Sequence, residues 1–130
     1  MQPKSLTSGS ESADHTSVRA CVQTYLDGHA LNSATHMHQA FLPTAHVEGH
    51  RQGVFTSWPL AEYCVAFKGS PAIDEASRVR RIEWVDVVGD AAAAKATLVH
   101  GDMTFTDFFV LLKVAGAWKI ANKVYSTQQA

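Results

Sequence analysis

The sequence lacks the features that mark several large classes of protein. Its formal net charge is only −1 over 130 residues, with no basic stripe and no acidic tail, which makes nucleic acid and anionic membranes poor partners. No apolar run approaches the roughly 20 residues of a membrane span. The polar first residues lack the apolar core of a signal peptide, so we expect a cytoplasmic location. There is no phosphate-binding loop, dinucleotide fingerprint or nucleophile motif.

Cysteine is also scarce. The two cysteines, Cys21 and Cys64, fall in segments that are expected to be helical, and nothing in their spacing pairs them. We therefore expect two reduced thiols, as is usual in the cytoplasm. The composition, 46% hydrophobic and 18% charged, is that of an ordinary globular chain. We predict a polar, flexible tail over residues 1–13 and a single domain over residues 14–127.

The N-terminal half of the chain favours helices. Apolar residues recur at helical spacing over residues 14–31, and Ser12 or Asp14 can cap this helix. Asn32 or Ser33 can cap a second, short helix that follows directly. We expect both helices to turn their apolar stripes toward a common core.

The rest of the chain favours strands, with one more helix between them. Apolar and polar residues alternate over residues 44–52, which predicts a strand. A third helix is expected to begin at Ser57, with Pro59 in its first turn. Long strands are then predicted over residues 78–88, 91–100, 103–114 and 118–126. Helices followed by a run of antiparallel strands indicate the α+β class.

Residues 104–126 form the most informative stretch, a hairpin with few charges. A two-residue loop would need a positive φ at Ala115, which is unfavourable for a residue with a Cβ. We therefore predict a three-residue loop with a positive φ only at Gly116. In that register Asp107 faces Lys123, and we predict an ion pair between them.

Both faces of this predicted hairpin are largely apolar. One face would hold Phe108, Val110, Leu112, Trp118, Ile120 and Val124. The other would hold Phe105, Asp107, Phe109, Leu111, Lys123 and Tyr125. Helices can cover only one face, whereas the second face of a monomeric antiparallel sheet usually meets water. We expect the second face to pack against another copy of the chain in a homodimer.

A metal site was considered at His46, Glu48 and His50. Alternate residues of a strand share a face, and two imidazoles with a carboxylate can bind a metal ion. The same pattern is also typical of a polar strand edge that faces water, which is the interpretation we favour. We expect no metal ion and no cofactor.

Three blocks of the sequence resemble a known family. Residues 25–41, 87–96 and 106–125 are similar to the putative lumazine-binding family of the nuclear transport factor 2-like (cystatin-like) superfamily. The resemblance extends over about residues 15–126. It implies helices packed on a strongly curved antiparallel sheet, which together form a cone with a pocket in its mouth. It also implies a homodimer built through the sheet.

The superfamily includes ketosteroid isomerase-like enzymes, SnoaL-like polyketide cyclases and small dehydratases. By this resemblance Tyr25 lies where an isomerase keeps its oxyanion-hole tyrosine, and Gly49 lies where the isomerase has its catalytic aspartate. Without that general base the isomerase reaction loses its proton transfer. For the isomerase reaction a replacement base would have to come from His46, Glu48 or His50. A proton-transfer enzyme of another type could use His46, Glu48 or Asp107.

Three functions stay open at this point. The chain is either a protein that binds a small molecule, or an enzyme of unknown reaction with a mostly apolar pocket, which would suit a small, planar ligand. The expected ligand contacts are Tyr25, Trp58, Tyr63, Asp107 and Lys123. The first alternative is a proton-transfer enzyme, of the isomerase, dehydratase or cyclase type. The second is a dimeric interaction scaffold without catalysis.

Overall fold

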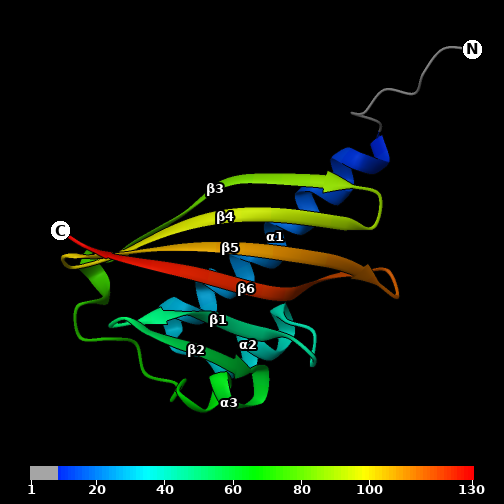
Figure 1. The fold of residues 1–130 in the computed structure, drawn as a ribbon. Helices are drawn as coiled ribbons and strands as arrows, with labels where there is room; N and C mark the ends of the chain where they lie inside the picture. The colour runs from blue at the N-terminus through cyan, green and yellow to red at the C-terminus, as the bar shows by residue number, and fades with distance from the viewer. Residues whose placement is uncertain (1–8) are drawn as a thin grey trace, which may run out of the picture.

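Three helices pack on a six-stranded sheet in the computed structural model, which describes residues 9–130 (Figure 1). The elements are α1 (Gly9–Leu31), α2 (Ala34–Ala40), β1 (His46–Arg51), β2 (Val54–Pro59), α3 (Leu60–Val65), a short 3₁₀ helix (Glu75–Ser77), β3 (Val79–Val88), β4 (Ala91–His100), β5 (Met103–Val114) and β6 (Ala117–Gln129). The strand order is β2-β1-β6-β5-β4-β3. The α+β prediction is confirmed.

The four long strands form the predicted meander. Strands β3 to β6 pair antiparallel in sequence order, and the bounds of β4 and β5 match the prediction. The sheet as a whole is mixed, because β1 pairs parallel with β6. The link starts just before β1, where the backbone N–H of Leu42 donates to the carbonyl oxygen of Ile120 at 2.9 Å. This contact places β1 and β2 beside the C-terminal strand.

The predicted start of the third helix at Ser57 is wrong. Residues Val54–Pro59 form β2, which pairs with β1 in a hairpin. Gln52 and Gly53 make the turn with φ values of 50° and 80°, the positive pair that a tight hairpin turn requires. Cross-strand pairing holds Ser57 extended, and the helix α3 begins only at Leu60.

The first helix begins earlier than predicted, at Gly9, so Ser12 and Asp14 lie inside it and do not cap it. The Asp14 carboxylate instead accepts hydrogen bonds from Lys113 Nζ at 2.9 Å and Trp118 Nε1 at 3.1 Å. Of the predicted tail, residues 1–8 lie outside the described residues. The predicted cap of α2 is confirmed at Ser33, whose hydroxyl accepts from the backbone N–H of His36.

The loop of the β5–β6 hairpin also differs from the prediction. Val114 pairs with Ala117, so the loop contains only Ala115 and Gly116, with φ values of 51° and 81°. The predicted three-residue loop is wrong. A two-residue turn with two positive φ values matches the twist of the flanking strands, and this match outweighs the local preference of Ala115.

A bulge in β6 corrects the predicted faces of the hairpin. Val110 pairs with Asn122 and Leu111 with Ile120, so Ala121 is an extra residue. Trp118 and Ile120 therefore turn to the helix-covered face and are buried, contrary to the prediction. A one-residue slip exchanges the two faces of a strand.

The shorter loop and the bulge each shift the register by one residue. Beyond the bulge the total shift is two residues, which leaves each side chain on its predicted face of the sheet. Asp107 pairs with Tyr125, and Lys123 pairs with Phe109, so the predicted direct pairing of Asp107 with Lys123 is wrong. The two side chains still lie on the same face of the sheet, as diagonal neighbours within reach of each other. Their predicted ion pair is confirmed, with 3.6 Å between Lys123 Nζ and Asp107 Oδ2.

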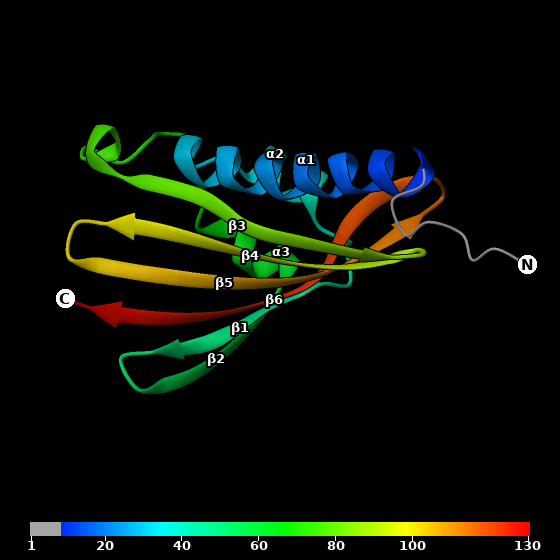
Figure 2. The same cartoon turned by 90° about the horizontal axis from the view of Figure 1, so that it is seen from above.

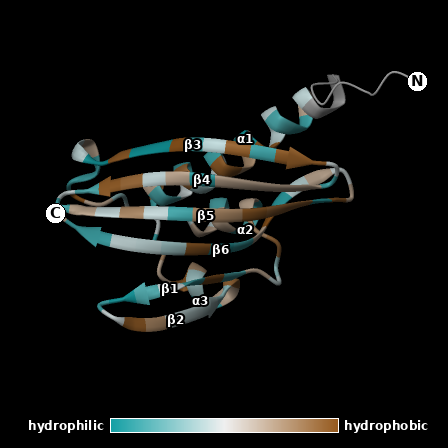
Figure 3. Cartoon of the chain, turned by 45° about the horizontal axis from the view of Figure 1, so that its top comes forward, coloured by the Kyte–Doolittle hydropathy of each residue, from teal (hydrophilic) through white to brown (hydrophobic). Residues whose placement is uncertain are grey.

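The helices leave one face of the sheet uncovered. Figure 2 shows α1 and α2 along one side of the curved sheet, with no helix along the other. Hydrophobic residues run along β3 and β5 in Figure 3. The hydrophobic residues exposed on the uncovered face include Trp84 of β3, Phe108, Val110 and Leu112 of β5, and Val124 of β6. The covered face holds the core, in which α1 packs Val18, Val22, Tyr25 and Leu26 among Phe109, Leu111 and Ile120.

Candidate functional site

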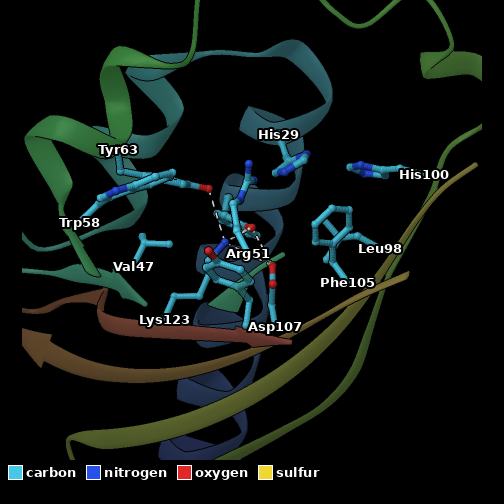
Figure 4. A pocket seen from close by; sticks show the side chains of 12 residues that line it. His29, Val47, Arg51, Trp58, Tyr63, Leu98, His100, Phe105, Asp107 and Lys123 are labelled. Atoms are coloured by element: carbon cyan, nitrogen blue, oxygen red, sulfur yellow. Dashed lines mark hydrogen bonds and ion pairs between the residues drawn. The ribbon is translucent and has the colours of Figure 1, made fainter. Parts of the chain in front are cut away.

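A cavity of about 130 Å³ opens between the helices and the covered face of the sheet (Figure 4). All five residues that the sequence suggested as ligand contacts line it, namely Tyr25, Trp58, Tyr63, Asp107 and Lys123. They come from α1, β2, α3, β5 and β6, so the fold brings together side chains from five elements. Their role as ligand contacts stays a prediction.

The floor of the cavity is a buried chain of hydrogen bonds between Lys123, Tyr25 and Asp107. Lys123 Nζ donates to the Tyr25 hydroxyl at 2.6 Å, and this hydroxyl donates to Asp107 Oδ2, also at 2.6 Å. The direction is settled because an ammonium group can only donate and a carboxylate can only accept. The side chains of Lys123 and Asp107 are only 5% and 2% exposed.

The surroundings of Lys123 keep it charged. Burial by itself would lower the pKa of Lys123, but the attraction of Asp107 and Tyr63 and the hydrogen bonds to them outweigh burial and raise the pKa. Its ammonium group lies 4.7, 5.2 and 5.5 Å from the ring centres of Tyr25, Tyr63 and Tyr125. These rings provide cation–π contacts on several sides.

Tyr25 stays protonated in this setting. Burial, followed by the negative charge of Asp107, raises the pKa of the Tyr25 hydroxyl well above its ordinary value. The floor therefore holds one positive charge, one negative charge and a neutral phenol between them. Because the Tyr25 hydroxyl already donates its hydrogen bond to Asp107, it cannot donate a second one to a ligand.

Two histidines that the sequence did not single out as site residues form one wall. His29 and His100 lie with ring centres 5.1 Å apart, and His100 is 5.2 Å from the ring of Phe105. Burial lowers the pKa of His29 to about 2 and that of His100 to about 4, helped by nearby cations that include Arg80. Both rings are therefore neutral near pH 7. His29 stands one helical turn after Tyr25, and this spacing could have identified it.

Arg51, at the outer end of β1, marks the mouth of the cavity. It is exposed, and its guanidinium carbon lies 5.7 Å from the centre of the Trp58 ring. Trp58 in turn lies 6.4 Å from the ring of Tyr63. Arg51 could not be predicted as a site residue, because a single exposed arginine at a strand end carries no local signal for a site.

The two other catalytic candidates, His46 and Glu48, do not line the cavity. In β1 the buried residues are Val47 and Gly49, so the residues that alternate with them face away. The Glu48 carboxylate accepts from Asn122 Nδ2 at 3.0 Å, and this bond, followed by one from Ser57, lowers the pKa of Glu48. Only Tyr25 and Asp107 among the catalytic candidates meet in one place.

Gly49 lies where β1 comes too close to β6 to leave room for a side chain. A Cβ at this position would come within 2.6 Å of the Tyr125 carbonyl oxygen and 2.8 Å of its ring. The parallel pairing of β1 with β6 brings the two backbones this close. Any side chain at position 49 would therefore have to displace Tyr125.

Within residues 9–130, no three His, Cys, Asp or Glu side chains gather closely enough to hold a metal ion. Cys21 and Cys64 are both buried free thiols. No helix in the same range is long and apolar enough to cross a membrane.

Comparison with known families agrees with the fold. Residues 13–126 match the model of the family described as putative lumazine-binding. The chain belongs to this family. The family match covers every element that lines the cavity. A comparison with curated proteins finds no match.

Solved structures place this family member in the nuclear transport factor 2-like superfamily. A protein from Shewanella baltica is 26% identical, with a TM-score of 0.80 over 92% of this chain and 97% of that one. A protein from Silicibacter pomeroyi is 24% identical, with a TM-score of 0.80 over 90% of this chain and 98% of that one. Both are described as nuclear transport factor 2-like proteins of unknown function.

A more distant neighbour is the association domain of CaMKII from C. elegans. It is 15% identical, with a TM-score of 0.70 over 90% of this chain and 98% of that one. At this level of identity the likeness concerns the fold alone.

Proposed function

We propose that this protein binds a small molecule in the cavity between α1, α3 and the sheet. The observation that carries the proposal is the buried Lys123–Tyr25–Asp107 chain at the floor of an open cavity. It supplies one ammonium donor and one carboxylate at the bottom of a mostly aromatic pocket. Pockets with apolar walls and a few convergent polar groups are typical of small-molecule sites.

The energetics of the floor support a functional reading. Moving a lysine and an aspartate out of water costs several kcal/mol for each ion, and their attraction often only offsets this. Replacing such a pair by packed apolar residues is often neutral or stabilising. The fold therefore has no evident need for Lys123 and Asp107 at this place, whereas a polar ligand would use them.

The size of the cavity limits the ligand. An engineered apolar cavity of about 150 Å³ binds benzene, and the cavity here is about 130 Å³. A molecule with one ring fits this volume. A bicyclic molecule such as lumazine would require the mouth at Arg51 and Trp58 to open further.

A titration followed by amide and side-chain NMR tests the proposal. Single-ring compounds with hydroxyl, amide or carboxyl groups are added, and we expect saturable shifts at Tyr63, Phe105 and Lys123. A bound ligand should raise the free energy of unfolding, by about 2.7 kcal/mol at a ligand concentration a hundredfold above Kd. The melting temperature should rise with it. If no compound shifts the cavity residues, or if shifts occur only on the uncovered face of the sheet, the proposal fails.

Two tyrosine variants provide a matched control. The Tyr63 hydroxyl lies 3.4 Å from Lys123 Nζ, whereas the Tyr125 hydroxyl lies 2.8 Å from Thr56 Oγ1. Because Thr56 donates its single hydrogen to the Gly49 carbonyl, Tyr125 must donate to Thr56. We expect Tyr63→Phe to weaken ligand binding several-fold and Tyr125→Phe to change mainly stability.

We also propose that the protein is a cytoplasmic homodimer paired through the uncovered face of the sheet. Phe108, Val110 and Val124 are each about half exposed there, at 44%, 53% and 48%. Contiguous exposed apolar side chains of this kind mark interaction surfaces. An association domain is among the proteins of similar fold, which supports the proposal that this fold can assemble into oligomers. The alternative function is a dimeric scaffold without catalysis, in which assembly is the main role.

Proton-transfer catalysis is the second candidate, favoured by one observation. Asp107 lies in the cavity beside Lys123, so it could act as a base while Lys123 and Tyr63 stabilise a developing oxyanion. Tyr25 would have to leave Asp107 before it could donate to that oxyanion. The test is exchange of an acidic C–H proton of a bound carbonyl compound in D₂O, which Asp107→Asn should abolish.

A further inference from the structure

The charges that line the cavity are unevenly distributed from floor to mouth. At the floor, Lys123 and Asp107 balance each other at 3.6 Å. The wall histidines are neutral near pH 7, because their pKa values lie at about 2 and about 4. The remaining charge among the lining residues is the guanidinium of Arg51 at the mouth.

Arg51 differs from the arginines around β3. Arg78, Arg80 and Arg81 each pair with an acidic side chain, respectively Asp74, Glu75 and Glu83. Within the described residues Arg51 has no such pair, and its guanidinium instead lies over the ring of Trp58. A stacked guanidinium keeps its five N–H donors directed outward in one plane, which suits a carboxylate.

Lys123 retains donor capacity at the opposite end. Of its three N–H groups, one donates to Tyr25 at 2.6 Å and a second makes only a long hydrogen bond to Tyr63 at 3.4 Å, while the Asp107 carboxylate lies at 3.6 Å. A neutral oxygen of a ligand can therefore accept from Lys123 without displacing Tyr25. A second negative charge at the floor would face the carboxylate of Asp107.

The walls between mouth and floor are aromatic and apolar. Figure 4 shows Trp58 and Tyr63 on one side of the cavity and His100, Leu98 and Phe105 on the other, with Lys123 and Asp107 below them. These side chains favour a flat ring over a flexible chain, since aromatic pairs prefer stacked or edge-to-face contacts.

We propose that the ligand is a single-ring organic acid, with its carboxylate paired to Arg51 at the mouth and a neutral oxygen on its far end bound to Lys123 at the floor. The inference rests on the proposed ligand-binding function and adds the chemical class and the orientation of the ligand. Arg51 is then the specificity-determining residue of the site.

The test compares acids with neutral amides of the same shape. The probes are benzoate, 4-hydroxybenzoate and nicotinate, each paired with its amide, titrated by calorimetry or NMR. We expect at least one acid to bind about tenfold more tightly than its amide, as for a charge-assisted bidentate hydrogen bond. The hydroxyl of 4-hydroxybenzoate should strengthen binding relative to benzoate, because its oxygen can accept a hydrogen bond from Lys123.

Three arginine variants distinguish the role of Arg51 from a general effect of charge. Arg51→Gln should reduce the acid-to-amide ratio to about one, chiefly by weakening the binding of the acid, and Arg51→Lys should retain part of the preference. Arg19→Gln removes the same charge at an exposed position of α1, away from the cavity, and should retain the full preference for acids. Because Arg51 is exposed, these variants are expected to fold normally.

The outcomes separate this inference from the proposed function. If amides bind as tightly as acids, or if Arg51→Gln keeps the preference, the ligand class is wrong although small-molecule binding stands. If no acid of the panel binds, the inference also fails. If no neutral single-ring compound reaches the cavity either, the proposed function falls with it.

Discussion

Lys123 donates a hydrogen bond of 2.6 Å to the hydroxyl of Tyr25, a residue 98 positions earlier in the chain. Both side chains are buried, and the Tyr25 hydroxyl in turn donates a hydrogen bond to Asp107. A helix, a central strand and the last strand are thus joined at one point in the core. The same point is the floor of the cavity, so the proposed ligand would contact groups that are also bonded within the core.

Removing one member of the buried ion pair should be costly. We expect Lys123→Met to lower the free energy of unfolding by about 3–5 kcal/mol, because it leaves the Asp107 carboxylate buried without its counter-charge. Adding Asp107→Asn should recover a large part of the loss, since Asn removes the charge and still accepts from Tyr25. Urea denaturation measures all three proteins. Lys113→Met is the control, because its partly exposed pair with Asp14 is screened by water and should contribute far less to stability.

The β5–β6 turn offers a stabilising substitution. Ala115 adopts a φ of 51° directly before Gly116, a combination for which Asn-Gly is the preferred sequence. Ala115→Asn should therefore raise the stability by about 0.5–1 kcal/mol. Ala117→Asn, placed in the strand beside the turn, should give no gain. Equal effects of the two substitutions would contradict the two-residue turn.

The buried wall histidine should make the fold sensitive to acid. His29 has a folded-state pKa of about 2, below its ordinary value of 6.5. As the pH falls, this histidine is therefore protonated in the unfolded chain before it is protonated in the folded protein. Its contribution is complete above pH 6.5 and declines as the pH falls toward 2, amounting to a loss of up to about 3 kcal/mol by pH 4.5. His100 acts in the same direction between 6.5 and about 4.

Substitution of His29 measures this effect. We expect His29→Phe to flatten the dependence of the unfolding free energy on pH between 6.5 and 4.5. Urea denaturation at each pH measures this free energy. His38→Phe, at an exposed position on α2, should leave the slope as it is. An unchanged slope in His29→Phe would mean that this histidine is protonated in the folded protein.

The proposed dimer can be tested on the uncovered face of the sheet. We expect the wild-type protein to sediment as a dimer at micromolar concentration and Val110→Asp to raise the dimer dissociation constant about tenfold or more, because it would bury an unpaired charge. Val65→Asp is the matched control, since Val65 is an exposed valine on α3. A monomeric wild type at this concentration would contradict both the dimer and the scaffold alternative.

Much of the sheet could be predicted from the sequence because its signals are local. The alternation of residues 91–100 and 103–114 and the glycine at each turn set the bounds of β4 and β5 correctly. The predicted side of Asp107 and Lys123 was right, although the pairing was not, because two one-residue errors added up to a two-residue shift beyond Ala121, which keeps each side chain on the same face. A bulge is set by packing across strands, which local patterns do not report.

The candidate site was predictable only in part, and for the same reason. Tyr25, Asp107 and Lys123 stood out as polar groups among apolar neighbours, which is visible in the sequence. Arg51 and His100 are unremarkable in sequence, and they matter because β1 and β4 end at the same cavity.

The sequence by itself determined the class of fold, the long strands, the family and the few polar residues placed among apolar ones. Tertiary structure alone decided that Lys123 reaches Tyr25, that Gly49 has no room for a side chain beside Tyr125, and that Arg51 lies over Trp58 at the mouth of the cavity. The physical reason is the range of the interactions involved. Periodicity and turn chemistry act between residues close in the chain, whereas burial, ion pairing and steric closure depend on which distant elements come together.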